Sequence, residues 1–138
     1  MASHSHIGAE RLAPSLDDIA ALAESERSRL MPALGRYLEG IPFRIEEFAD
    51  DEVLAAMGIE NPFELLGLYH GGSLLAEETA ATGTMPALIF LYRRPMLDYW
   101  CETGEPLGRV VRHVLIHEIG HHFGLSDDDM ERIEAATD

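Results

Sequence analysis

Residues 107–127 read LGRVVRHVLIHEIGHHFGLSD, and this stretch decides how the rest of the chain is interpreted. Its apolar residues recur at intervals of three and four, which predicts an amphipathic helix from Leu107 to Phe123. Pro106 suits the start of that helix, because its missing N–H would be unpaired there. Gly124 suits the end, because it tolerates a positive φ. The pattern therefore predicts one helix with a defined beginning and end.

The predicted helix carries an H-E-x-x-H pattern at His117, Glu118 and His121. Residues four apart on a helix are separated by about 40°, so the two imidazoles face one point. Such a pair can bind Zn²⁺ at the usual Zn–N distance of about 2.0–2.1 Å. Glu118 projects about 100° to one side, where it can act as a general base on metal-activated water. The sequence predicts one zinc ion per chain, with Glu118 as the catalytic residue.

Two histidines leave zinc under-coordinated, so a third protein ligand is expected. Gly124 can turn the chain back, and Asp127 would then bring a carboxylate to the metal. We predict Asp127 as this ligand, with Asp128 and Glu131 as alternatives. A competing interpretation is that Ser126 caps a last helix and that the acidic residues after it only favour the helix dipole.

The neighbouring histidines receive other predictions. A metal held by His117 and His121 is out of reach of His113, which we predict to be a buried polar group or a cleft residue. We predict His122 to lie in the core or to support the ligands. A hydrolase of this type also needs a group that steadies the oxyanion. The candidates are Tyr69, His70, Tyr92, Tyr99 and Arg112, and the sequence does not choose among them.

The rest of the sequence alternates helical patterns with short apolar runs, which predicts an α+β domain. The expected helices are 16–38, 50–57, 96–100 and one that follows Ser126, and the expected strands are 41–48, 65–70 and 87–92. We predict a flexible tail at 1–14, a single domain at 15–138 and a loop or hairpin at 73–85. Strand 87–92 is interpreted either as an interior strand or as a sheet edge that binds an extended peptide.

The chain of 138 residues has a formal net charge of −15, and its ten basic residues are all arginine. This charge argues against a nucleic-acid partner and favours cationic peptides. The sequence contains no apolar run long enough to span a membrane and no signal-peptide pattern. With a single cysteine the chain cannot form an internal disulfide. We expect a cytoplasmic protein with no membrane partner.

Three blocks of the sequence together resemble the small bacterial zincin-like metallopeptidases. The blocks are Leu65–Tyr69 followed by Gly71, Leu91–Pro95 followed by Leu97 and Asp98, and Val111-Arg112 leading into the pattern at 117–127. The resemblance covers about residues 16–135. It implies a minimal metzincin-like fold, with a small twisted mixed sheet beside a backing helix and an active-site helix. It also implies His117, His121 and Asp127 as zinc ligands and Glu118 as the base.

The pattern departs from the larger metzincins, whose third ligand is usually histidine and whose C-terminal subdomain contains a methionine turn. The sequence ends soon after Asp127, so we expect no such subdomain. The predicted function is hydrolysis of a peptide or protein substrate by a zinc-dependent peptidase. Two alternatives are a metzincin-like metal-dependent ribonuclease and a non-catalytic, regulatory metal-binding domain. The charge argues against the first and the presence of Glu118 against the second. No oligomeric state is predicted.

Overall fold

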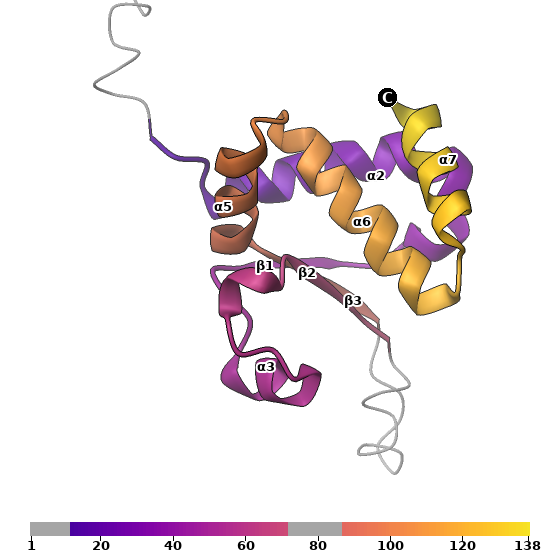
Figure 1. The fold of residues 1–138 in the computed structure, drawn as a ribbon. Helices are drawn as coiled ribbons and strands as arrows, with labels where there is room; N and C mark the ends of the chain where they lie inside the picture. Colours follow the sequence, from indigo (N-terminus) through magenta and orange to yellow (C-terminus); the bar gives the residue numbers. More distant parts are fainter. Residues whose placement is uncertain (1–11, 72–86) are drawn as a thin grey trace, which may run out of the picture.

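The structure is a computed structural model that describes residues 12–71 and 87–138. Helices and a small sheet alternate along these residues, which confirms the predicted α+β class (Figure 1). The loop predicted at 73–85 and most of the tail predicted at 1–14 lie outside the described residues. The elements in chain order are α2 (Leu16–Leu38), β1 (Phe43–Glu46), α3 (Asp51–Met57), the 3₁₀ helix η2 (Pro62–Glu64), β2 (Gly67–His70), β3 (Leu88–Tyr92), α5 (Arg93–Thr103), α6 (Leu107–Phe123) and α7 (Asp127–Thr137).

The described sheet has three strands in the order β1-β3-β2. β3 runs parallel to β1, with Phe43 opposite Ile89, and antiparallel to β2, with Tyr69 also opposite Ile89. β3 is therefore the central strand, and the question left open for residues 87–92 is answered in favour of an interior strand. The interpretation of these residues as a peptide-binding edge is wrong, because both sides of β3 are already paired.

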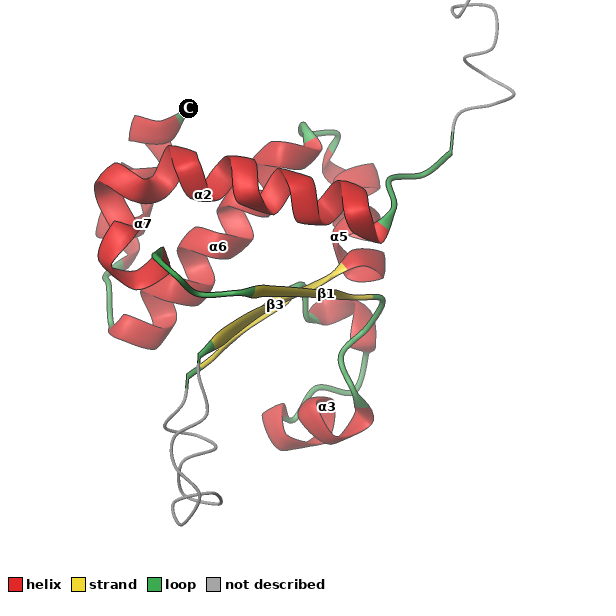
Figure 2. Ribbon diagram, turned by 180° about the vertical axis from the view of Figure 1, so that it is seen from behind, coloured by secondary structure: helices red, strands yellow, loops and turns green. Residues whose placement is uncertain are grey.

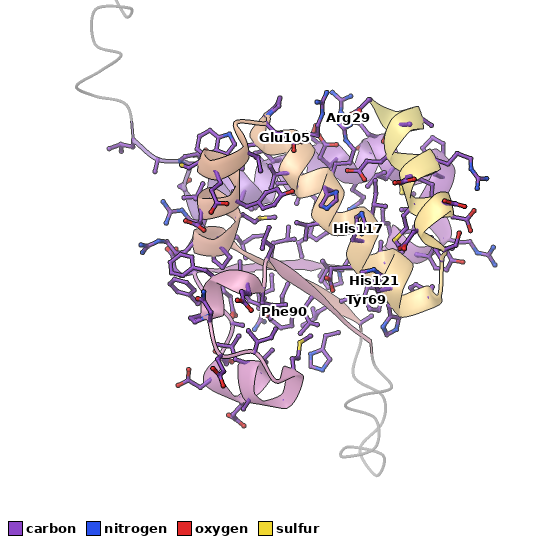
Figure 3. The ribbon with its side chains drawn as sticks, viewed as in Figure 1. Arg29, Tyr69, Phe90, Glu105, His117 and His121 are labelled. Atoms are coloured by element: carbon purple, nitrogen blue, oxygen red, sulfur yellow. The ribbon has the colours of Figure 1, made fainter. Side chains whose placement is uncertain are left out.

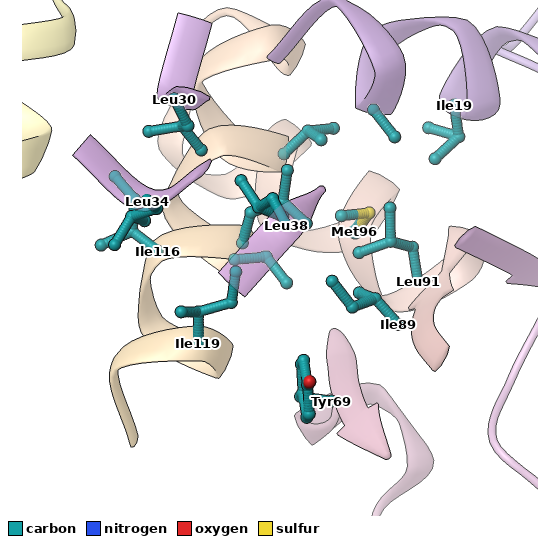
Figure 4. Close-up of a cluster of buried hydrophobic side chains, with 14 of the residues drawn as sticks. Ile19, Leu30, Leu34, Leu38, Tyr69, Ile89, Leu91, Met96, Ile116 and Ile119 are labelled. Atoms are coloured by element: carbon teal, nitrogen blue, oxygen red, sulfur yellow. The ribbon is translucent and has the colours of Figure 1, made fainter. Parts of the chain in front are cut away.

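Two faces of the sheet carry two separate clusters of buried side chains. α2 and α6 cover one face, where Ile89 and Leu91 of β3 pack among leucine and isoleucine side chains of the two helices (Figure 4). α3 lies on the opposite side of the strands (Figure 2), where Leu54 packs with Leu65 and Tyr92. Burying one such side chain contributes about 1.5–3 kcal/mol. These contacts hold α6 against the sheet.

The helix predicted at 16–38 has the observed limits of α2. Ser15 and Asp18 form a capping box at its start, with Ser15 Oγ 3.0 Å from the Asp18 amide that donates to it. Leu34 interrupts the helix with φ −126° and ψ 15°, two residues after Pro32. None of the helices in the described ranges is long and apolar enough to cross a membrane.

α5 is longer than the helix predicted at 96–100, because it begins at Arg93 and continues to Thr103. Pro95 falls in the first turn, where a backbone N–H has no helical acceptor, so the ring does not interrupt the helix. Arg93 also anchors this start, since its Nε donates to the Pro14 carbonyl at 2.6 Å and its side chain pairs with Glu47 at 3.0 Å. The sequence pattern misses these contacts because their partners are distant in the chain.

Candidate metal centre

The motif helix α6 has the limits that the sequence predicts, Leu107 to Phe123. Its apolar side is buried against α2 and the sheet. His117 and His121 lie one turn apart on the same helix (Figure 3), with ring centroids 5.7 Å apart. His117 is partly buried and His121 is exposed. The structure thus brings the two predicted histidine ligands together, as their spacing requires.

The turn after the motif also follows the prediction. Gly124 ends α6 with φ +78°, a conformation that most other residues avoid. Ser126 then caps α7, and its Oγ accepts a hydrogen bond from the Asp129 amide at 3.0 Å. Asp127 is the first residue of α7 and is exposed. Its position suits the helix dipole, so its role as third ligand stays a prediction.

A second carboxylate, which the sequence did not single out, lies beside the histidines. Glu134 of α7 places Oε2 2.8 Å from His113 Nδ1 and Oε1 3.7 Å from His117 Nε2. The rings of His113 and His117 are 4.1 Å apart. One ligand atom from each of these three residues lies within 4.8 Å of the other two. The chemistry of this donor set, two imidazole nitrogens and one carboxylate oxygen, is that of many catalytic zinc sites.

A signal for Glu134 was present in the sequence. The turn between the helices is centred on Leu125 and Ser126. His117 lies eight residues before Leu125, and Glu134 lies eight residues after Ser126. When two helices are joined by a short turn, residues that lie at the same distance from the turn along each helix come close together. The spacing alone did not show which sides of the two helices would meet.

The two central side chains of the motif have shifted pKa values. Burial lowers the pKa of His117, as do His113 and His121, while Glu134 acts in the opposite direction. The lowered pKa favours the neutral imidazole, which is the form that binds a metal. Burial raises the pKa of Glu118, against the effects of the Tyr69 amide and of His121. Glu118 Oε1 accepts a hydrogen bond from that amide at 3.2 Å, which ties the carboxylate to β2.

The motif opens on a pocket of about 240 Å³. α6, α5 and the segment before β2 line it, with Glu64, Leu65, Leu66, Gly67, Tyr99, His113, Val114, His117 and Glu118. His113 is therefore a cleft residue, one of the two places predicted for it. A neighbouring pocket of about 350 Å³ shares Glu64, Leu66 and Tyr99 with the first and adds Asp98 and Glu102 to its lining.

The structure separates the candidates for an oxyanion-stabilising group. Tyr99 lines the pocket beside Glu118, and its ring is nearly parallel to that of His113, with centroids 6.5 Å apart. Tyr69 is a buried core residue on the α6 side of the sheet, and its ring is tilted by 38° against that of His122, with centroids 4.3 Å apart. Of the five candidates, Tyr99 is the one that lines this pocket.

The remaining three candidates lie in other surroundings. His70 and Tyr92 both approach Phe90, each at 6.1 Å between ring centroids, and Tyr92 is only 1% exposed. Burial, together with nearby carboxylates, raises the pKa of Tyr92, so its phenol stays protonated. The guanidinium of Arg112 is bound by Glu26 at 2.7 Å and by Asp138 at 2.5 Å. These positions favour packing and pairing roles.

A comparison with known protein families places the chain in one of them. A family model described as zincin-like metallopeptidase matches residues 38–137. The chain belongs to this family. The match extends from the end of α2 to the last turn of α7, so it includes the sheet, the motif helix and both candidate carboxylates. No curated protein matches the chain. The zincin-like fold that the sequence blocks implied is thus confirmed, and a metal-dependent, peptidase-type function is supported.

Proposed function

We propose that this zincin-like protein is a zinc-dependent peptidase that uses Glu118 as its general base. His117, His121 and Asp127 are the proposed ligands of the catalytic ion. The observation that carries the proposal is the position of Glu118. Its carboxylate is partly buried, lines the pocket beside His117, and is held by the backbone amide of Tyr69.

The chemistry divides between the ion and the chain. When bound, zinc supplies a Lewis acid that polarises the carbonyl oxygen of a peptide bond. Glu118 takes a proton from the attacking water and passes it to the nitrogen of the leaving amine. Its raised pKa makes it a stronger base than an exposed glutamate. The hydrogen bond from the Tyr69 amide orients this carboxylate, and Glu118 also lines the pocket.

The edge of β2 that faces away from β3 borders the pocket and offers a place for the substrate backbone. The Leu66 carbonyl accepts a hydrogen bond from Tyr92 of β3, whereas the Tyr69 amide points to Glu118. Backbone N–H and C=O groups alternate in direction along a strand, so those of Gly67 and Tyr69 point away from β3. Among the described strands none pairs with that side of β2. An extended peptide that adds there lies beside Glu118.

Tyr99 is the proposed donor to the oxyanion. It is half-buried on α5 and lines the same pocket as Glu118 and His117. A phenol hydroxyl can donate to the oxygen that becomes negative when water adds to the carbonyl carbon. Replacing one such donor costs about 10²–10³-fold in rate. Tyr99→Phe is therefore expected to lose about that much, with Tyr69→Phe as the matched control.

The lining of the neighbouring pocket supports a preference for cationic substrates. Glu64, Asp98 and Glu102 all line it, and it adjoins the pocket of the motif. Carboxylates that face a shared hollow attract arginine and lysine side chains. The net charge of −15 acts in the same direction at longer range. We therefore expect cleavage next to basic residues.

The decisive experiment compares the wild type with Glu118→Gln. Both proteins are purified, their zinc content is measured, and a peptide library is used to detect cleavage. Glu118→Gln should keep about one zinc per chain and lose about 10²–10⁴-fold in rate, the usual contribution of a general base. Asp129→Asn, which changes an α7 carboxylate paired with Arg132, serves as the control. Undiminished cleavage by Glu118→Gln, or no cleavage by the zinc-loaded wild type, contradicts the proposal.

A further inference from the structure

α6 carries three histidines on one side, and the H-E-x-x-H pattern uses only two of them. His113, His117 and His121 are spaced four apart, so His117 has a histidine one turn before it and another one turn after it. The earlier pair, His113 and His117, has the closer rings, at 4.1 Å against 5.7 Å for the later pair. Either pair has the spacing that binds a metal.

Glu134 completes the earlier pair. Each of its carboxylate oxygens lies nearest a different imidazole, Oε2 at 2.8 Å from His113 and Oε1 at 3.7 Å from His117. The arginines near it pair elsewhere: Arg112 with Glu26 and Asp138, and Arg132 with Asp129. Among the described residues, the ion pairs of Glu134 are with these two histidines. Its charge is therefore directed at the imidazoles.

The distances suit a divalent ion after small side-chain movements. Ligand atoms about 2.05 Å from a tetrahedral ion are about 3.3 Å from one another. The three ligand atoms here lie within 4.8 Å of one another, and the closest contact, 2.8 Å, is the hydrogen bond that an ion would replace. The side chains of His113, His117 and Glu134 are 40%, 31% and 23% exposed, so an ion has access to them.

We propose that His113, His117 and Glu134 form a second seat for a zinc ion, here called the upper seat. It shares His117 with the seat of the H-E-x-x-H pattern, His117, His121 and Asp127. Because one imidazole nitrogen binds one ion, the two seats are alternatives, and a chain holds a single zinc in either. The inference rests on the proposed function only through this shared residue, since zinc binding at the upper seat requires no peptidase activity.

The test removes the ligands that belong to the pattern alone. The full chain carrying His121→Ala and Asp127→Asn is freed of metal and titrated with Co²⁺, whose visible spectrum reports bound imidazole, and then with Zn²⁺. We expect about one equivalent to bind. Adding Glu134→Gln to this double variant should weaken binding by about 100-fold or more, and adding His113→Ala should do the same. Adding Asp129→Asn instead is the matched control on α7 and should change little.

Each outcome of these metal titrations either supports or overturns the proposal. The proposal is overturned when the double variant is folded by circular dichroism yet binds no metal. It is also overturned when binding survives both Glu134→Gln and His113→Ala, since other histidines such as His4 and His6 would then hold the ion. Failure of the peptidase proposal looks different, because undiminished cleavage by Glu118→Gln leaves these titrations unchanged. An empty double variant beside an active, zinc-loaded wild type refutes the upper seat alone.

Discussion

Arg112 and His113 are neighbours on α6, yet each belongs to a cluster of a different kind. Arg112 joins Glu26 of α2 and Asp138 in what we call the arginine cluster, and the side chains of Arg112 and Glu26 are only 8% and 5% exposed. His113 joins His117 and Glu134 in the histidine cluster, which faces a pocket. Both clusters connect α6 to the end of the described chain.

The two clusters differ in whether their polar groups can still bind a further ligand. In the arginine cluster the charges of Arg112 and Glu26 are paired and buried, so another charged ligand has nothing to gain between them. In the histidine cluster the two imidazoles make a single hydrogen bond within residues 12–71 and 87–138, the one between His113 and Glu134, and solvent reaches both rings. The first arrangement stabilises helix packing, and the second is suited to a metal ion. Four predictions test this contrast, beginning with the largest effect.

Breaking the arginine cluster should have the largest effect on stability. Arg112→Met leaves the Glu26 carboxylate buried without its partner, which typically costs about 3–5 kcal/mol. Arg109→Met is the matched control, because Arg109 also pairs with Asp138 but is 44% exposed, and such pairs contribute about 0–1 kcal/mol. Urea unfolding of both variants measures the difference. Equal losses would show that the arginine cluster is no more important than a surface ion pair.

The histidine cluster should respond to metal instead. A ligand that binds only the folded state stabilises it by about 2.7 kcal/mol at 100 times its Kd. Zinc at that excess should therefore stabilise the metal-free wild type by about this amount, and His117→Ala should lose most of the gain, because both seats use His117. His70→Ala, on the other side of the sheet, should keep it. Thermal unfolding with and without zinc provides the measurement.

Packing between α6 and α7 should have an intermediate effect. A Cβ at Gly120 would lie 2.2 Å from Sδ of Met130, which is fully buried, so Gly120→Ala forces the two helices apart. We expect a loss of about 1–3 kcal/mol and weaker zinc binding, because Glu134 is carried by α7. Gly35→Ala is the control, since its Cβ would meet only the flexible end of Met31 at 3.2 Å. An unaffected Gly120→Ala protein would mean that α7 packs elsewhere.

The smallest expected effect is a dependence of stability on pH. Burial raises the folded-state pKa of Glu118 above its ordinary value of 4.5. The stability that the folded protein has while Glu118 is protonated is fully present below the pKa of the unfolded state. It is lost as the pH rises through the pKa of the folded state. Metal-free Glu118→Gln, which cannot ionise, should therefore gain stability relative to wild type between pH 4 and pH 7. Urea unfolding at several pH values tests this, with the exposed Glu131→Gln as the control.

The sequence predicted α6 and its site pattern well because the information is local. The limits of α6 depend on Pro106 and Gly124, and the pairing of His117 with His121 depends only on helical rise. The same holds for α2, whose start is set by the capping box of Ser15 and Asp18. The start of α5 was missed because Arg93 is held by Pro14 and Glu47, far away in the chain.

The sequence could not choose among the candidate site residues, because their positions also depend on contacts between distant parts of the chain. Tyr99 and Tyr92 were equal candidates in the sequence, and only the packing of α5 beside α6 puts Tyr99 at the pocket while Tyr92 is enclosed. Glu134 lies 17 positions after His117, and its place beside the histidines depends on how α7 packs on Gly120.

By itself, the sequence determined the motif helix, the pair of histidines that H-E-x-x-H places on one side, and the glutamate between them. Helical geometry repeats every few residues, so contacts within one helix follow from spacing. Only the tertiary structure decided that β3 is the central strand, that Glu118 is tied to the Tyr69 amide, and that Glu134 faces His113 and His117. Those contacts join separate elements, whose relative positions depend on side-chain packing across the whole core.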